Sequence, residues 1–317
     1  MEACHSPQEY NVTSYGDTAL AIITLEAFAG MWINAFIVSV LCIGWIKKKT
    51  MNSNEKILLL LGCSRSWYLG ISWVYSFLLI IHPYCSCVPL LLESLAGIQS
   101  FFDCSNICVS ACLCVFYCIK IANFRNRFFI YLKVKIDRMV PWLLLASVLL
   151  AFIFSILVYH ISNETQCSNR NYSSQGYYLK HIIRVDEHLV PIFFFTGFIF
   201  CTSLTAVIFS ALFLLFSLWR HKCKMQTNSM NSLSMDAHIK AMKSILSFLV
   251  MYSINFIFFI LTLIYSRKKE NHMAFFIFAF LYAFPGVHSL FLIFSNPKLK
   301  KTLIRILSCV KCKVCMR

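Results

Sequence analysis

Seven long apolar stretches constrain the fold of this chain more than any other feature. A helix needs about 20 apolar residues to cross the ~30 Å hydrocarbon core of a bilayer, and each stretch is long enough to do so. Backbone groups in lipid must be hydrogen-bonded internally, which favours helices. The sequence therefore predicts an all-α membrane protein, a bundle of seven transmembrane helices. The stretches lie at about residues 19–46, 57–81, 88–119, 139–161, 188–218, 243–265 and 273–295.

The composition excludes a soluble protein. The chain is 59% apolar and only 13% charged, whereas a globular domain is roughly half apolar and about a quarter charged. A formal net charge of +16 would suggest nucleic-acid binding in a soluble protein, but the apolar spans exclude that class. In a membrane protein, surplus Lys and Arg usually mark the cytoplasmic loops.

The distribution of the cations predicts the orientation of the bundle. Alternate connections on one side carry most of the Lys and Arg residues, and the opposite side carries few. The positive-inside rule then places the N-terminus outside and the C-terminus inside. Three glycosylation sequons agree, because all of them fall on the predicted outer side. They begin at Asn11, Asn163 and Asn171.

Three regions follow from this topology. Residues 1–18 are expected to form an extracellular N-terminus, residues 19–295 the seven-helix domain, and residues 296–317 a cytoplasmic tail. In the tail, apolar and cationic residues alternate at helical spacing from Leu299 to Val310. This pattern predicts a short amphipathic helix that follows the seventh span and lies along the inner leaflet.

The end of the tail carries three regularly spaced cysteines, Cys309, Cys312 and Cys315. Their spacing resembles that of metal ligands, but a fourth ligand of comparable proximity is missing. Palmitoylation is the better interpretation in a basic juxtamembrane tail, with reduced thiols as the alternative.

Two polar residues lie deep inside predicted spans. Arg65 is eight residues into the second span, or ~12 Å at 1.5 Å per residue, and Asn34 is in the middle of the first. A charge at the bilayer centre costs about 2.5 kcal/mol or more by insertion scales, so Arg65 must face the bundle and find acceptors. A structural clasp between helices and a direct part in switching both remain open, and one clasp can do both.

The third span carries a polar face near its outer end. Gln99, Asp103 and Asn106 are spaced four and three residues apart, so they share one side of a helix. Asp103 precedes Lys120 by seventeen residues, which places it ~25 Å from the inner boundary. The position predicts ligand contact at the outer mouth of the bundle. The alternative is that Asp103 pairs with another helix, or is protonated, and binds nothing.

Catalytic and metal chemistry find no support in the sequence. The His residues are scattered over loops and helix ends, and the acidic residues do not cluster. There is no His-Glu-x-x-His motif and no Gly-rich phosphate loop. We therefore expect no enzyme, no metal site and no cofactor.

Several motifs resemble those of the bitter taste receptors, the taste receptors type 2. The run "FYCIKIANFRNRFFIYLKVKI" at the inner end of the third span looks like the family segment FY-x-x-KIANFSN-x-x-F-x-x-LK. Ser64-Arg65 in "LLLLGCSRSW", "FSLWRHKCKMQ", "AHIKAMKSILSFL" and "PGVHSLFLIFSNPKLKK" are similar to the second-helix, fifth-helix, sixth-helix and seventh-helix segments of that family. The resemblance covers nearly the whole chain in the correct order.

The resemblance implies a multi-pass G-protein-coupled receptor of the plasma membrane. Such a receptor detects bitter small molecules in an outer pocket and activates gustducin or a related inhibitory-class heterotrimeric G protein. By resemblance, Asn34, Arg65, His288 and Ser289 would form a polar switch network. Lys120, Asn123, His221 and Lys243 would face the G protein. Membrane lipid is a further expected partner, and oligomer formation is left open.

Departures from the family are concentrated in the expected pocket. Members often have Trp where this chain has Gln99 and Asn where it has Asp103, and several have an acidic residue where it has Phe278. The expected ligand-binding set is Gln99, Asp103, Asn106 and Phe278. The acidic Asp103 suggests a preference for cationic or hydrogen-bond-donating ligands.

A small seven-helix channel or transporter is the alternative function. It would need internal repeats, helices broken by Gly or Pro at the midplane, or a polar pathway. The chain has only nine glycines and seven prolines. The receptor interpretation is therefore favoured.

Overall fold

The computed structural model describes residues 9–81, 88–122, 126–169, 190–225, 232–265 and 271–315. Within these ranges the chain is helical apart from short connections, and no strand is assigned. The helices are α1 (Glu9–Lys48), α2 (Ser53–Ile81), α3 (Val88–Ile121), α4 (Arg127–Asn169), α6 (Val190–Met225), α7 (Ser232–Tyr265), α8 (Asn271–Ser295) and α9 (Pro297–Cys315).

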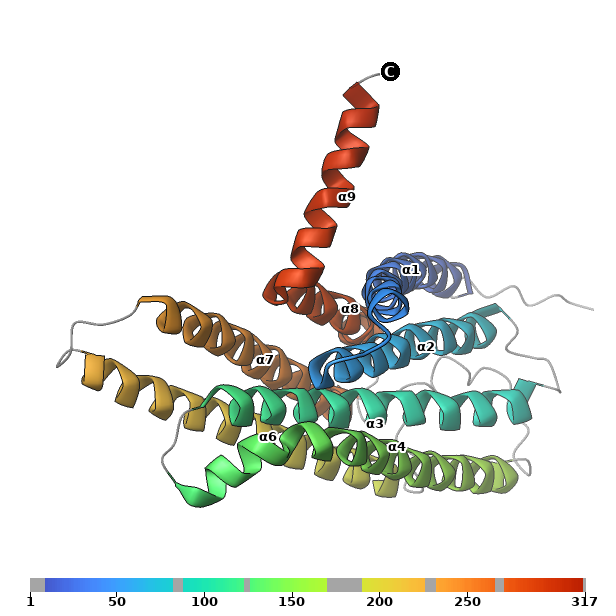
Figure 1. Cartoon of the computed structure of the whole chain (residues 1–317). Coiled ribbons are helices and arrows are strands. Elements are labelled where there is room, and N and C mark those ends of the chain that lie inside the picture. The colour runs from blue at the N-terminus through green and yellow to red at the C-terminus, as the bar shows by residue number, and fades with distance from the viewer. Residues whose placement is uncertain are drawn as a thin grey trace, which may run out of the picture.

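The long helices gather into one bundle, and α9 leaves it at a steep angle (Figure 1). α3 has the central position, since it packs against α2, α4, α6 and α7. α1 packs against α2 and α8, and α7 against α6 and α8. We call the end of the bundle where α1 begins the outer end and the opposite one the inner end, after the predicted orientation.

Six of the described helices, α1 to α4, α6 and α7, are long and apolar enough to cross a membrane. α8 passes the same test together with α9, as a pair bent by 97°. The count is therefore six spans, or seven with that pair. This agrees with the predicted series of apolar segments, because α8 lies where the seventh was expected.

The bundle is packed around α3 and apolar on its outside. Val109, Leu113 and Cys114 of α3 are fully buried. On the outward surface, Trp32 and Trp142 expose 76% and 72% of their area. Such large exposed rings suit contact with lipid, because water would penalise them.

The connection between the third and fourth helices is shorter than the sequence predicts. The predicted third and fourth spans, residues 88–119 and 139–161, leave residues 120–138 as a connection, but α3 continues to Ile121 and α4 already begins at Arg127. Asn126 caps α4, since its Oδ1 accepts the backbone N–H of Phe128 at 3.1 Å. Such a cap satisfies a free amide of the first turn and favours an early helix start.

α9 starts with a well-formed cap of its own. Asn296 Oδ1 accepts the backbone N–H groups of Lys298 at 3.0 Å and Leu299 at 3.4 Å, and Pro297 takes the first helical position, where its missing N–H costs nothing. Leu299 is fully buried against the bundle. Further along, Ile306 and Leu307 are exposed, so α9 presents a second apolar surface away from the bundle.

Candidate ligand cavity and polar network

A buried polar network connects four helices through Arg65. The Arg65 side chain on α2 is only 2% exposed. Its Nη1 donates to Ser289 Oγ of α8 at 2.8 Å, and its Nη2 donates to Ser110 Oγ of α3 at 3.3 Å. Ser289 Oγ in turn donates to Asn34 Oδ1 of α1 at 2.7 Å. The structure thus brings together the predicted Asn34 and Arg65, with Ser289 as the bridge between them.

His288 joins the same network and its tautomer follows from its partner. Arg65 Nη2 lies 2.6 Å from His288 Nδ1, and a guanidinium can only donate. Nδ1 must therefore accept, and a neutral ring carries its hydrogen on Nε2. This Nε2 is buried without a hydrogen-bond partner among the described residues. The ring centroid lies 4.4 Å from that of Phe248 on α7, so the network reaches a fifth helix.

Close contact between α1 and α8 makes the bridge through Ser289 geometrically feasible. A Cβ added to Gly286 would lie 3.2 Å from the Cα of Gly30, which is closer than side chains normally pack. Asn34, one turn beyond Gly30, also donates from Nδ2 to the Gly30 carbonyl at 2.8 Å. The two glycines let the helix backbones approach until Asn34 reaches α8.

A cavity of about 140 Å³ adjoins this network and extends toward the outer end. α2, α3, α6, α7 and α8 all contribute to its wall. Arg65, Ser110 and His288 belong both to the wall and to the polar network, so whatever fills the cavity lies against the network. The lining residues are Arg65, Tyr68, Asp103, Asn106, Ile107, Ser110, Thr196, Phe200, Tyr252, Asn255, Phe259, Thr262, Leu281, Phe284, Pro285 and His288.

Two of the four predicted ligand residues line the cavity. Asp103 and Asn106 do so, whereas Gln99 is not among its described lining residues. The side chain of Phe278 lies outside the described part of the structure. Asn106 Oδ1 is buried without a partner among the described residues, and neither of the two ion pairs found there includes Asp103.

Three polar residues of α7 are among the lining residues that sequence reasoning missed. Tyr252, Asn255 and Thr262 are spaced three and seven residues apart, which places them on one side of the helix, and all three line the cavity. The phenol of Tyr252 also donates to the Ile107 carbonyl of α3 at 2.8 Å. The available signal was Asn255 in an otherwise apolar span, since polar residues inside membrane helices usually face the bundle.

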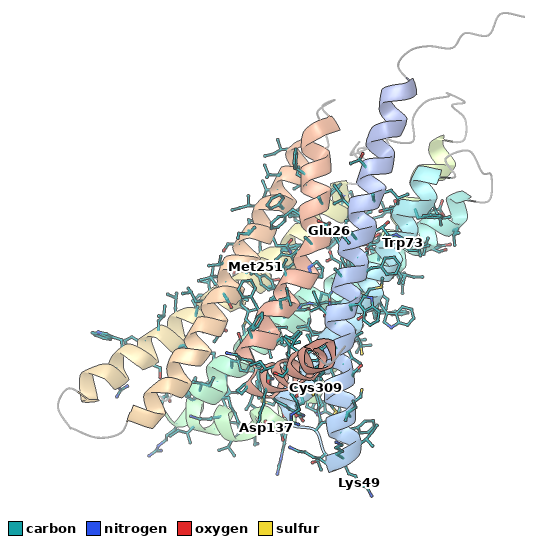
Figure 2. The ribbon with its side chains drawn as sticks, turned by 90° about the horizontal axis from the view of Figure 1, so that it is seen from above. Glu26, Lys49, Trp73, Asp137, Met251 and Cys309 are labelled. Atoms are coloured by element: carbon teal, nitrogen blue, oxygen red, sulfur yellow. The ribbon has the colours of Figure 1, made fainter. Side chains whose placement is uncertain are left out.

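Among the described residues, two ion pairs connect helices at the inner end. Lys120 Nζ of α3 bonds Asp137 of α4 at 2.5 Å, and both side chains are about half exposed. Lys298 Nζ of α9 bonds Glu55 of α2 at 2.5 Å. Figure 2 shows Lys49 and Asp137 at this end of the bundle, and Glu26 and Trp73 nearer the other end.

Several predicted residues lie outside what the structure describes. Asn123 and Asn171 lie outside the described residues, as do Cys85 and Cys87, whose pairing with Cys167 the sequence leaves open. For four further residues the backbone is helical, but their side chains lie outside the described part. These are Asn11, Asn163, His221 and Lys243.

Comparison with known proteins decides the family. The model of the family described as Taste receptor protein (TAS2R) matches residues 12–311. The chain belongs to this family. Curated relatives of the receptor include human taste receptor type 2 member 2, which is 29% identical over 93% of this chain and 97% of its own length. Taste receptor type 2 member 10 of Papio hamadryas is 32% identical over 92% of this chain and 94% of its own length. Mouse member 109 is 31% identical over 93% of both chains.

This membership confirms the family resemblance found in the sequence. The receptor is a bitter taste receptor of the G-protein-coupled class and a multi-pass protein of the plasma membrane. Its apolar helices agree with that location. The family consists of receptors and not of enzymes.

Proposed function

We propose that the receptor binds bitter small molecules in the 140 Å³ cavity and transmits their binding to a gustducin-type or other inhibitory-class G protein at its inner end. One observation carries this proposal: Arg65 and His288 line the cavity and also belong to the network that links α1, α2, α3 and α8. A ligand in the cavity therefore lies against groups that fix the relative positions of these helices.

The proposed mechanism is a shift between two packings of the bundle. A ligand changes such an equilibrium only by its different affinity for the two states. His288 contacts Phe248 of α7, and Tyr252 of α7 bonds the backbone of α3. A ligand that occupies the wall near Tyr252 and Asn255 is thus placed to alter how α7 packs on α3 and α8. We assign the ligand contacts to Asp103 and Asn106, with Gln99 and Phe278 as further candidates.

At the inner end we assign the G-protein-facing surface to Lys120, Asn123, His221 and Lys243. The described part of this surface supports the proposal through Lys120, which is 45% exposed although it is paired with Asp137. An exposed ion pair is worth little in stability, so Lys120 can exchange Asp137 for an acceptor on a partner at small cost.

Modification and lipid contact complete the proposal. We assign glycans to Asn11, Asn163 and Asn171 at the outer side, and lipid contact to the exposed Ile306 and Leu307 of α9. The exposed thiol of Cys309 is the described candidate for palmitoylation. Formation of receptor oligomers would add a further contact between copies of this chain.

Calcium imaging tests the function directly. Cells that express the full chain with a gustducin-type chimeric Gα are exposed to a panel of bitter compounds, and surface expression is verified. We expect at least one compound to give a saturable response that Asn255→Leu weakens, because Asn255 lines the cavity. Trp142→Leu, on the lipid-facing surface, is the control and should leave the response unchanged. Silence across the panel at normal surface expression would contradict the proposal.

A further inference from the structure

The charge of Arg65 lacks an opposite charge in contact with it. Its described partners are the hydroxyls of Ser110 and Ser289 and the Nδ1 atom of His288, and all of these are neutral acceptors. Among the described residues, both ion pairs lie elsewhere, at Lys120–Asp137 and Lys298–Glu55. A guanidinium stays protonated at physiological pH, and a buried charge without a counter-charge is strongly unfavourable.

Asp103 is the acidic residue among the described residues that line the cavity, but it lies too far away to neutralise Arg65. It precedes Ser110, the α3 contact of Arg65, by seven residues. At a rise of 1.5 Å per residue, this separation is about 10 Å along the helix. The cavity therefore has a carboxyl group near one end and an unneutralised cation at the other.

The cavity has the space and the hydrogen-bond donors that an anion needs. Its volume of about 140 Å³ greatly exceeds the roughly 10–15 Å³ that a single water requires. Three described contacts of Arg65 occupy three of its five N–H groups. Ser110, which accepts from Arg65, and the amide of Asn255 also line the cavity and can donate to an anion.

We infer that Arg65, with Ser110 and the adjoining cavity wall, forms an anion-binding site. This goes beyond the proposed function, because it assigns the chemical class of the group that contacts Arg65 and requires no G protein. Two sources can supply the same chemistry: a free halide such as chloride, or the carboxylate of a ligand whose remaining part fills the cavity. In either case the anion supplies the counter-charge that Arg65 lacks and stabilises the packing of α2 against α3 and α8.

The test measures thermal stability of the full-length receptor in lipid nanodiscs. Sodium gluconate is replaced by sodium chloride at constant ionic strength, and sodium benzoate is compared with benzamide in gluconate buffer. If a free halide is the source, chloride should raise Tm by about 3 °C over gluconate. If a ligand carboxylate is the source, benzoate should raise Tm in gluconate whereas benzamide should not, and chloride should have no effect.

Two variants locate the effect. Arg65→Gln keeps an amide donor and removes the charge, and should abolish the anion-dependent rise in Tm. Lys298→Gln removes a cation of the inner end that is paired with Glu55, and should retain the rise. If Arg65→Gln yields no folded receptor, Ser110→Ala should shift the anion titration to a several-fold higher concentration.

Three results would overturn the site: no rise with either anion, an equal rise in Arg65→Gln, or an unchanged midpoint in Ser110→Ala. Failure of the calcium assay would leave this test unaffected, because Tm reports binding without signalling. The two proposals can therefore fail separately.

Discussion

Arg65 of α2 and His288 of α8 meet at 2.6 Å, Nη2 to Nδ1, on the wall that the polar network shares with the cavity. They are separated by 223 positions in the chain. Since Arg65 can only donate, the contact fixes the His288 tautomer and leaves Nε2–H as the buried donor. The contact thus joins α2 and α8, two of the five helices that line the cavity.

Loss of the Ser289 hydroxyl should destabilise the receptor. In Ser289→Ala, Asn34 Oδ1 loses its hydrogen-bond donor and Arg65 Nη1 loses its acceptor. Buried polar groups left unpaired cost about 1–3 kcal/mol each. Tm in nanodiscs should fall by several degrees. Ser66→Ala is the control, because Ser66 Oγ only bonds the Gly62 carbonyl of its own helix; an equal fall there would refute the role of the bridge.

The close approach of α1 and α8 should make Gly286 intolerant of a side chain. In Gly286→Ala the new Cβ would lie 3.2 Å from the Cα of Gly30, so two backbones must move apart at a cost of about 1–3 kcal/mol. In Gly70→Ala the Cβ would meet Met31 Sδ at an ordinary 3.6 Å, and helix propensity improves by about 1 kcal/mol. Thermal unfolding should show a lower Tm for Gly286→Ala and no lower Tm for Gly70→Ala. The reverse result would contradict this packing.

Asp103 should distinguish cationic from neutral agonists. Hydrogen bonds to a charged group contribute about 1.5–3 kcal/mol, so Asp103→Asn should lower the potency of protonated amine agonists by about 10-fold to 100-fold. Neutral agonists should lose little, because asparagine keeps the shape and one acceptor. Dose-response curves from calcium imaging provide the measurement. If the original receptor and the Asp103→Asn variant respond equally to protonated amines, Asp103 does not contact the ligand charge.

The two inner-end ion pairs should differ in strength. Glu55 is 14% exposed and Lys298 35%, whereas both side chains of the Lys120–Asp137 pair are nearly half exposed. Exposed pairs contribute about 0.2–1 kcal/mol, and water screens them more strongly. A double-mutant cycle on Tm with Glu55→Gln and Lys298→Gln should therefore give the larger coupling. A larger coupling between Lys120 and Asp137 would show that burial does not control these contacts.

Much of the bundle could be predicted because hydrophobicity is a local property of the chain. The apolar segments of α2 and α3 lie where the sequence places them, and Arg65 faces the bundle as its charge requires. The start of α4 at Arg127 was missed, because the cap of Asn126 outweighs the cationic, loop-like composition of the following residues. On α3, helical periodicity grouped Gln99 with Asp103, but the described lining of the cavity includes only the latter.

The sequence by itself determined which segments are apolar, which polar residues must avoid lipid, and the family to which the receptor belongs. Only the tertiary structure decided which acceptors Arg65 finds. Ser110 and Ser289 are 45 and 224 positions away from Arg65. Nothing in the sequence distinguishes them from serines that only bond their own helix. Partner choice depends on how the helix faces pack, and the contact of Gly30 with Gly286 sets that packing across two distant segments.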